Sequence, residues 1–319
     1  MGTPEFGAII LEGLLRQVLG FRVQVLAVVT APDKPTGRKQ ILTPSSVKVV
    51  AEKYKIPILQ TEKILNLKSK ILNLKPDLIV VAAYGQILPK EILEIPKYGC
   101  LNVHPSLLPK YRGPSPIRYA ILNGDKETGV TIILMDEKMD HGPVLGQRGL
   151  EIRENETSAT LHDKLADLGA SLLMETISKW IRKIIKSQPQ DDKKATFTKV
   201  LTRGDGKINW KKTAEGLERE VRAYFPWPGS HTFWEKSGKT AQIKILKARV
   251  FKSPSGIKYP VGKTLVVPQN ELGVQCGKGS LPSGDNFLVI EKLQMEGGKE
   301  MGSEEFLRGH LDFIGTILK

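Results

Sequence analysis

The stretch DLIVVAAYGQILPKEILEIPKYGCLNV, residues 77–103, has the pattern of a strand, a helix and a second strand. Apolar and β-branched residues fill 77–83 and 100–103, as is typical of strands that are buried on both faces. Residues 90–95 between them have the pattern of a short helix. A helical connection between two buried strands predicts a parallel pair with a right-handed crossover. This stretch therefore indicates an α/β fold.

The same alternation of strands and helices continues on both sides of this unit. Further strands are expected at 21–30, 56–59 and 130–135, and helices at 5–19, 45–55, 61–74 and 116–123. A long amphipathic pattern follows at 157–184, where Thr157 or Ser158 is placed to cap the first turn. Alternation of this kind predicts a largely parallel sheet covered by helices.

The character of the sequence changes near residue 185. Residues 187–205 show no clear period and contain Pro, Gly and many charged residues, which favours a linker. One helix is expected at 214–224, followed by short alternating stretches separated by turn signals, which is typical of a small barrel or sandwich. We therefore expect a first domain at 1–186, a linker at 187–205 and a smaller second domain at 206–319.

The chain carries a large excess of positive charge. Its 48 Lys and Arg against 34 Asp and Glu give a formal net charge of +14 at pH 7. Such an excess favours a polyanionic partner, nucleic acid above all. Scattered lysines are also typical of solvated helix faces, so the charge alone leaves both interpretations open.

Two further features concern the compartment. No apolar run approaches the ~20 residues that a membrane-spanning helix needs, and the first residues lack the pattern of a secretory signal. Cys100 and Cys276 lie far apart in the sequence and show no metal-ligand or redox spacing. We expect a cytoplasmic protein with reduced thiols and no membrane partner.

Polar side chains come at the ends of the expected strands. Asn102 and His104 lie two residues apart at the end of one strand, so their side chains point to the same side. Asp136 and Asp140 follow a later apolar strand. In a parallel sheet these residues would share the carboxyl edge, where open α/β sheets bind their ligands.

These residue types suit acyl transfer. An amide such as Asn102 can donate a hydrogen bond to a developing oxyanion. A carboxylate near His104 would orient the imidazole and favour its protonated form. No Ser or Cys has the setting of a nucleophile, so direct transfer to an external amine is favoured over a covalent acyl-enzyme. Any one of these residues at a loop start is also a common cap or turn residue, so a structural role stays open.

The sequence does not indicate a metal or dinucleotide site. The five histidines, at 104, 141, 162, 231 and 310, share no ligand spacing. The glycines near residues 2 and 85 fit neither a dinucleotide nor a P-loop fingerprint. We therefore expect no metal.

Several motifs occur in a fixed order along the chain. They are GTPEF (2–6), PDKPTGR (32–38), AYGQILP (83–89), NVHPSLLPKYRG (102–113) with Asp140 downstream, and FPWPG (225–229). This ordered set resembles the formyltransferase family that uses 10-formyltetrahydrofolate. Because the motifs span nearly the whole chain, the resemblance extends to both expected domains.

The resemblance implies a fold and an activity. The fold is a Rossmann-like, mostly parallel α/β domain followed by a smaller OB-like β-barrel. The activity is transfer of a formyl group from 10-formyltetrahydrofolate to the α-amino group of methionine on initiator tRNA. We expect the chain to act as a monomer.

The resemblance also implies roles for individual residues. Asn102, His104 and Asp140 match the catalytic residues of the family. The folate is expected to contact two segments, namely Ser106, Leu107, Leu108 and Pro109 in one and Tyr84, Gly85, Gln86 and Ile87 in the other. The basic loop at 32–40 is expected to reach the tRNA through Lys34, Arg38 and Lys39.

Two alternatives stay open at this point. The wider family also formylates purine precursors or nucleotide amino-sugars, or hydrolyses the folate, and the enzymes for nucleotide amino-sugars carry a barrel too. A non-catalytic RNA-binding protein on the same scaffold is the second alternative. The intact set of Asn102, His104 and Asp140 argues against it, because a binding module does not need all three.

Met1 occupies the boundary where the family has the end of its first strand. In a doubly wound sheet that strand lies in the middle, flanked on both sides. We therefore expect that the printed chain lacks this strand, and that the natural protein begins earlier with an apolar segment of about 5–6 residues.

Overall fold

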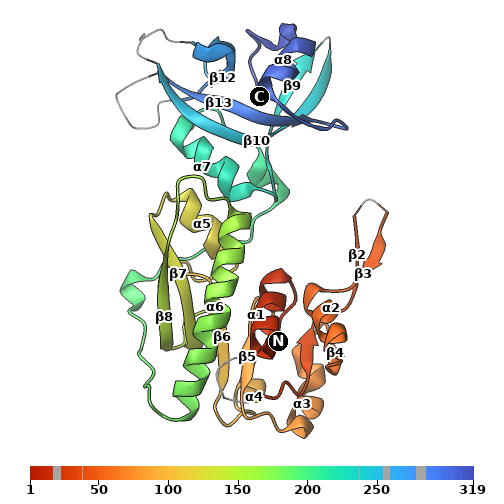
Figure 1. The fold of residues 1–319 in the computed structure, drawn as a ribbon, viewed down its shortest axis with the longest axis vertical. Helices are drawn as coiled ribbons and strands as arrows, with labels where there is room; N and C mark the ends of the chain where they lie inside the picture. Colours follow the sequence, from red (N-terminus) through yellow and green to blue (C-terminus); the bar gives the residue numbers. More distant parts are fainter. Residues whose placement is uncertain (17–22, 38, 237, 254–258, 278–284) are drawn as a thin grey trace. The chain divides into compact units, whose positions relative to one another are not determined.

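The computed structural model describes residues 1–16, 23–37, 39–236, 238–253, 259–277 and 285–319. Their contacts divide the chain into two compact units (Figure 1). Unit 1 consists of residues 1–117, 126–152 and 160–200, and unit 2 of residues 118–125, 153–159 and 201–319.

Unit 1 alternates strands and helices, as the sequence predicts. Its strands are β1 (Val28–Thr30), β2 (Lys34–Thr36), β3 (Ile41–Thr43), β4 (Ile58–Gln60), β5 (Ile79–Val81), β6 (Cys100–His104), β7 (Glu127–Leu134) and β8 (Val144–Glu151). Its helices are α1 (Glu5–Arg16), α2 (Ser46–Lys53), η1 (Ile64–Leu67), α3 (Lys68–Leu74), α4 (Lys90–Leu93) and most of α6 (Ser158–Ile181), and α5 (Pro116–Leu122) begins in this unit. The α/β class is confirmed.

Two parallel strand pairs form the middle of unit 1. β1 pairs with β4, and β5 pairs with β6. Met1 and Gly2 join the two pairs, because the Gly2 N–H donates to the Val29 carbonyl at 3.1 Å and the Ala82 N–H donates to the Met1 carbonyl at 2.9 Å. A Cβ on Gly2 would lie only 2.7 Å from the Ala82 oxygen, so this close approach requires glycine.

In the larger sheet, β7 runs opposite to its other strands, β5, β6 and β8. β7 is antiparallel to both β6 and β8, and His104 is paired with Thr131. The carboxyl end of β7 therefore lies beside the start of β6, away from His104. The expectation that Asp140 reaches the site because β7 ends at the same sheet edge is wrong. The apolar pattern of a strand does not indicate whether the strand pairs in parallel or antiparallel.

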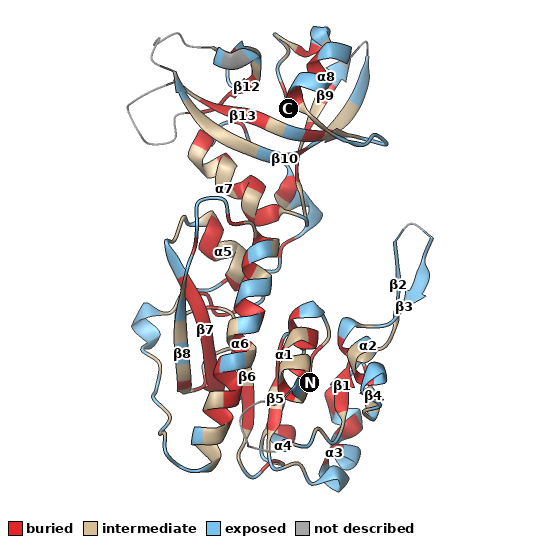
Figure 2. Ribbon diagram, in the orientation of Figure 1, coloured by how far each residue is buried: buried red, intermediate tan, exposed pale blue. Residues whose placement is uncertain are grey.

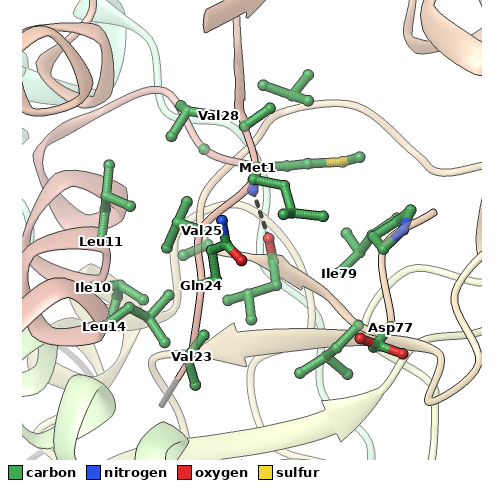
Figure 3. Close-up of a pocket in the computed structure, with 18 of the residues that line it drawn as sticks. Met1, Ile10, Leu11, Leu14, Val23, Gln24, Val25, Val28, Asp77 and Ile79 are labelled. Carbon is green, nitrogen blue, oxygen red and sulfur yellow. Dashed lines mark hydrogen bonds between the residues drawn. The ribbon is translucent and has the colours of Figure 1, made fainter. Parts of the chain in front are cut away.

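A cavity of ≈ 530 Å³ lies beside Met1 in the middle of unit 1 (Figure 3). Apolar side chains of α1, residues 23–29 and the segment leading into β5 line it. The Met1 amino group donates to the Val80 carbonyl at 2.5 Å, and burial lowers the pKa of this amine to about 6.

One expected strand is shorter than predicted. Of the strand expected at 21–30, the described residues form β1, and residues 23–27 border the cavity. Residues 21 and 22, like the end of the helix expected at 5–19, lie outside the described residues. The helix expected at 61–74 is divided into η1 and α3.

Unit 2 is an antiparallel sheet with two α-helices packed against it. Its elements are α7 (Ala214–Tyr224), β9 (Ser230–Lys236), β10 (Lys239–Ser253), β11 (Thr264–Val267), β12 (Glu271–Gln275), β13 (Asp285–Met295), β14 (Glu300–Gly302) and α8 (Ser303–Gly309). The strand order is β11-β12-β13-β10-β9, and β14 pairs with β13. Trp234, Phe306 and Phe313 are among its fully buried side chains.

The edges of this sheet do not pair with each other among the described strands, so a closed ring of strands is not seen there. Residues 316–319 lie between the two edges instead. Phe233 of β9 and Lys319 exchange backbone hydrogen bonds at 3.1 and 3.2 Å, while Thr264 N donates to Thr316 O at 2.9 Å and Leu318 N donates to Gly262 O at 2.9 Å.

Burial follows this architecture (Figure 2). β5 and β6 are mostly buried, whereas every residue of β2 and β3 is exposed. None of the helices in the described ranges combines the length and the apolar character that a membrane-spanning segment needs.

Candidate active site

The site begins with the alternation of side chains along β6. Leu101 and Val103 point into the core, where their exposed fractions are 0% and 1%. Asn102 and His104 therefore share the opposite side of the strand. Val81 of β5 is the parallel partner of Asn102, so the segment that follows β5 lies next to this end of β6.

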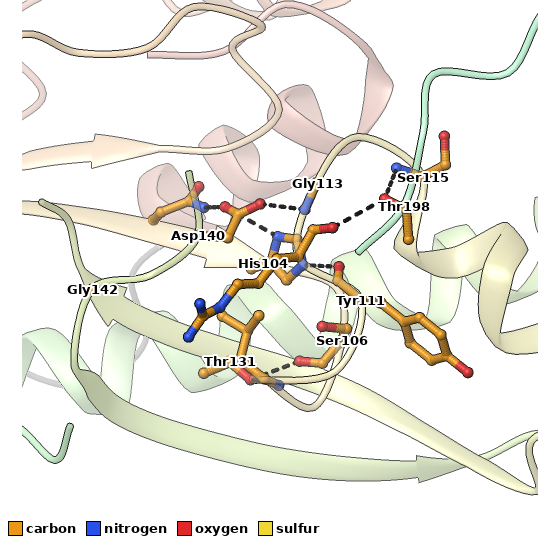
Figure 4. Close-up of polar contacts among 12 residues, drawn as sticks. His104, Ser106, Tyr111, Gly113, Ser115, Thr131, Asp140, Gly142 and Thr198 are labelled. Atoms are coloured by element: carbon orange, nitrogen blue, oxygen red, sulfur yellow. Dashed lines mark hydrogen bonds and ion pairs between the residues drawn. The ribbon is translucent and has the colours of Figure 1, made fainter. Parts of the chain in front are cut away.

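The carboxylate of Asp140 brings these groups together (Figure 4). Asn102 Nδ2 donates to Asp140 Oδ1 at 3.1 Å, and the Gly113 N–H donates to Oδ2 at 2.8 Å. His104 Nδ1 lies 3.5 Å from Oδ1. The structure thus places Asn102, His104 and Asp140 in one cluster.

The two ring nitrogens of His104 face two different acceptor groups. Its exposed fraction is 4%, and Nε2 lies 3.0 Å from the Tyr111 carbonyl, which can only accept a hydrogen bond. Nε2 therefore carries a proton. Nδ1 faces the Asp140 carboxylate, which is also only an acceptor when ionised. The carboxylate and the carbonyl thus hold the ring from both of its nitrogens.

Asp140 reaches the cluster through the loop between β7 and β8. Its φ of 50° lies in the left-handed region, which is uncommon for a residue other than glycine. Gly142 packs so closely on the end of β7 that a Cβ would lie 1.9 Å from the Leu134 oxygen. Asp136, the other aspartate of this loop, bonds to His141 Nδ1 at 2.6 Å instead.

The segment Ser106–Pro109 is held in place by side chains of β7 and β8. Thr131 Oγ1 donates to the Ser106 carbonyl at 2.6 Å and accepts from the Leu108 N–H at 3.1 Å. Gln147 Nε2 donates to the Leu108 carbonyl at 3.0 Å. Ser106 and Leu108 are buried, while Leu107 and Pro109 are half-buried.

The segment Tyr84–Ile87 offers a different kind of surface. Tyr84 is buried, but Gly85 is exposed and the Ile87 side chain is 68% exposed. Gln86 fixes the segment, since its Oε1 accepts from the Ile64 N–H at 2.8 Å. The peptide groups of 85–87 bond to no other described residue, which leaves their donors and acceptors available beside an apolar side chain.

The expected tRNA contacts are on the β2–β3 hairpin, which projects from unit 1 (Figure 1). Lys34 and Lys39 are exposed, and Arg38 lies outside the described residues. The base of the hairpin is anchored by Asp33, which accepts from Lys48 Nζ and from Gln60 Nε2, each at 2.7 Å. The hydrogen bond from Lys48 holds the pKa of Asp33 below its usual value.

Sequence reasoning missed one group of residues around the site. Residues 188–198, within the stretch expected to be a linker, bond to the loops that carry it. Thr196 Oγ1 accepts from Tyr111 N at 2.9 Å, and Thr198 Oγ1 accepts from Ser115 N at 3.1 Å. Because these bonds join segments far apart in the sequence, they leave no periodic pattern from which to predict them.

Two other chemistries find no support in the described part of the chain. None of its His, Cys, Asp and Glu side chains form a group of three or more arranged to hold a metal ion. Both cysteines are buried and unpaired, and burial raises the pKa of each thiol to about 12. A thiolate nucleophile at Cys100 is therefore disfavoured.

Comparisons with known proteins cover both units. The family model "Formyl transferase" matches residues 1–177, and "Formyl transferase, C-terminal domain" matches residues 200–311. A methionyl-tRNA formyltransferase of Caldanaerobacter subterraneus subsp. tengcongensis is 44% identical over 100% of this chain and 98% of its own. One of Halalkalibacterium halodurans is 43% identical over 97% of this chain and 93% of its own.

Solved structures with a similar fold share less sequence. A sugar 3N-formyl transferase determined with dTDP and 5-N-formyl-THF is 21% identical, with a TM-score of 0.61 over 91% of this chain and 95% of its own. An N-formyltransferase of Helicobacter canadensis in complex with folinic acid and dTDP-3-aminofucose is 20% identical, with a TM-score of 0.62 over 91% of this chain and 96% of its own.

Proposed function

This chain belongs to the formyl transferase family, and we propose that it transfers a formyl group from 10-formyltetrahydrofolate to the α-amino group of methionine on initiator methionyl-tRNA. The observation that carries the proposal is the convergence of Asn102 and His104 on Asp140 in a chain whose full-length relatives carry that enzyme's name. We also propose that the protein acts in the cytoplasm and as a monomer. The monomer is supported by the fact that one chain supplies every group that the chemistry needs.

The residues beside the cluster fit a folate. The available peptide groups of 85–87 match the donors and acceptors at the edge of a pterin ring, and Ile87 offers an apolar face. The segment Ser106–Pro109 supplies a wall whose own polar groups are already bonded. Bound there, 10-formyltetrahydrofolate supplies the formyl carbon that the amine attacks.

The proposed roles of the cluster follow from its hydrogen bonds. Asn102 donates one amide hydrogen to Asp140 and can donate the second to the formyl oxygen, which becomes negative as the amine attacks. The imidazolium of His104 stabilises that negative charge. Asp140 orients both donors, and its carboxylate assists removal of the proton that the attacking amine loses. As the new C–N bond forms, the bond between the formyl carbon and N10 of the folate breaks, and tetrahydrofolate leaves with a proton on that nitrogen.

We propose tRNA contacts on each of the two units, taken separately. Lys34, Arg38 and Lys39 would contact the acceptor end, and basic residues of unit 2 would hold phosphates. We also propose that the catalytic chemistry belongs to residues 1–186. The antiparallel sheet of unit 2, bridged by residues 316–319, is proposed to be an OB-like barrel. Folds of that kind are common platforms for nucleic acids.

The test is a formylation assay with purified protein and 10-formyltetrahydrofolate. Methionyl-tRNA and dTDP-3-aminofucose are offered separately, since structural neighbours include sugar formyltransferases. We expect formyl-methionyl-tRNA and no formylated sugar. Transfer to the sugar alone, or to neither acceptor, would contradict the proposal.

A further inference from the structure

Gln190 lies on the 188–198 segment, next to the loop that carries Asp140. The segment is fixed two residues earlier, where Gln188 and Val144 exchange backbone hydrogen bonds, both at 2.8 Å. Val144 is the first residue of β8, immediately after the 135–143 loop. The backbone pairing therefore places the side chain of Gln190 beside that loop.

The side-chain amide of Gln190 bonds to two different parts of the site. Its Nε2 donates to the carbonyl of Asp140 at 2.9 Å and to that of Gly142 at 2.8 Å. Its Oε1 accepts from Arg112 Nε at 3.1 Å and from a terminal nitrogen of the same guanidinium at 2.8 Å. All four bonds have ordinary lengths.

Only an amide satisfies these partners. The Arg112 guanidinium, 4% exposed, has donors and no acceptor, so it requires an oxygen. The carbonyls of Asp140 and Gly142 accept and cannot donate, so they require N–H groups. A carboxylate of the same shape would satisfy Arg112 and leave both carbonyls facing an oxygen.

The turn that Gln190 holds is one that the chain does not favour by itself. Asp140 has a φ of 50°, and such backbone persists only where the surroundings determine it. Gln190 bonds the carbonyl of Asp140 and that of Gly142, and thus clamps the backbone on both sides of the intervening His141. The carboxylate position of Asp140 depends on this backbone.

We propose that Gln190 is a positioning residue, which holds the 140–142 turn so that the Asp140 carboxylate meets Asn102, His104 and the Gly113 N–H. The inference rests on the proposed function, because it assigns Gln190 to the same reaction. Gln190 does not touch the substrates. It acts on catalysis through the geometry of Asp140.

The test compares Gln190→Glu with Gln188→Glu. Both changes add the same charge, and they lie two residues apart on one segment. Gln188 is exposed and pairs through its backbone, so its side chain has no place in the site. Gln190→Glu keeps the acceptor for Arg112 and removes the donors to the turn. Gln190→Met, with Gln188→Met as its control, removes the donors and the acceptor for Arg112 without adding charge, while Asp192 Oδ1 still accepts from the guanidinium at 2.8 Å.

We measure kcat and the KM for 10-formyltetrahydrofolate with methionyl-tRNA, together with the Tm of each variant. Displacement of a catalytic group typically costs on the order of 10-fold to 100-fold in rate, so we expect such a fall in kcat for both Gln190 variants. Their KM and Tm should match those of the Gln188 controls. A merely structural role would instead lower Tm and leave the kcat of the folded fraction unchanged.

The outcomes separate this inference from the proposed function. If the unchanged protein does not formylate methionyl-tRNA, the proposed function is wrong and the inference with it. If the unchanged protein is active but the Gln190 variants keep the kcat of their controls, only the inference is overturned. A change confined to KM also overturns it, since Gln190 would then act on binding.

Discussion

Asp140 is the residue on which the hydrogen bonds of the site converge. Asn102 and Gly113 both donate to its carboxylate, and His104 faces it. An asparagine at this position has nearly the same size but presents one NH₂ group to partners that are donors themselves. It also lacks the negative charge that balances the imidazolium and accepts a proton.

We predict that Asp140→Asn lowers kcat by on the order of 100-fold or more, the usual cost of losing a group that stabilises transition-state charge. Folate affinity should change little, because the folate is assigned to other segments. Asp136→Asn is the matched control, since Asp136 bonds to His141 outside the cluster. Equal kcat values for the two variants would show that Asp140 is not the catalytic carboxylate.

The candidate residues differ in how far the sequence could reveal them. Asn102 and His104 could be paired from spacing alone, because a strand places every second residue on one side. Asp140 could be named from its motif, but its approach through a loop after an antiparallel strand could not be predicted. The role of Gln190 could not be predicted from the sequence, because an amide can bond to backbone carbonyls whatever residues surround it in the sequence.

A further prediction at the residue scale concerns the buried amine of Met1 and the dependence of stability on pH. Its pKa is lowered from 8.0 to about 6, so between these values the unfolded chain binds more protons than the folded one. Where that holds, the free energy of unfolding rises with pH. For a chain with a free Met1 amino group, we predict a gain of up to about 3 kcal/mol from pH 6 to 8, at about 1.4 kcal/mol per pKa unit.

Denaturant unfolding of that chain at several pH values measures the gain. The control is a chain whose Met1 nitrogen is acylated, because an amide does not titrate in this range. The prediction concerns the difference between the two curves. Parallel curves from pH 5.5 to 8.5 would show that this amine is not buried in the folded state.

At the scale of elements, residues 316–319 stabilise unit 2 by joining its two sheet edges. Leu318 is 4% exposed and belongs to the core, whereas the neighbouring Ile317 is 54% exposed. We predict that Leu318→Ala lowers the free energy of unfolding by about 2–5 kcal/mol, the usual cost of truncating a buried leucine. Ile317→Ala should change it by less than about 0.5 kcal/mol.

Chemical denaturation followed by tryptophan fluorescence can test this pair of variants, because Trp234 lies in the same core. Both substitutions leave the backbone pairing intact, so the comparison isolates the buried side chain. Similar losses at both positions would mean that residues 316–319 are not docked as described.

The elements themselves were predicted best where a strand has partners on both sides. The apolar run at 77–83 contains β5, and the runs at 100–103 and 130–135 overlap β6 and β7, which extend to His104 and begin at Glu127. The run at 21–30 is equally apolar, yet within its described residues, 23–30, it forms a strand only at 28–30, because pairing depends on what lies beside it. Composition can show that a segment prefers a sheet, but not that a neighbour is present.

At the scale of the whole molecule, the +14 charge bears on tRNA binding. Each phosphate that a Lys or Arg neutralises releases counterions, so the logarithm of the tRNA affinity should fall linearly with the logarithm of salt concentration. We predict that Lys39→Ala makes this slope shallower by about 1 and leaves folate affinity unchanged. Lys68→Ala, an exposed lysine on α3, is the control.

Filter binding of methionyl-tRNA across a salt series gives the slopes. Arg38→Ala belongs in the same series, since the hairpin sequence places it between two other basic residues. If tRNA affinity does not change with salt, electrostatic recognition is excluded. If Lys39→Ala and Lys68→Ala give the same slope, the hairpin is not the contact.

The hydrogen bonds of the 188–198 segment also constrain when the site can form. Tyr111 and Thr196 are 85 residues apart in the sequence, and Arg112 and Thr198 are 86 apart. Contacts of such separation form after local helices, since closing a long loop costs entropy before any contact is gained. A growing polypeptide that has not reached residue 190 already contains Asn102, His104 and Asp140, but not the amide that clamps the 140–142 turn. During synthesis, the site can therefore become able to catalyse the reaction only after α6 has been made and the following segment has docked.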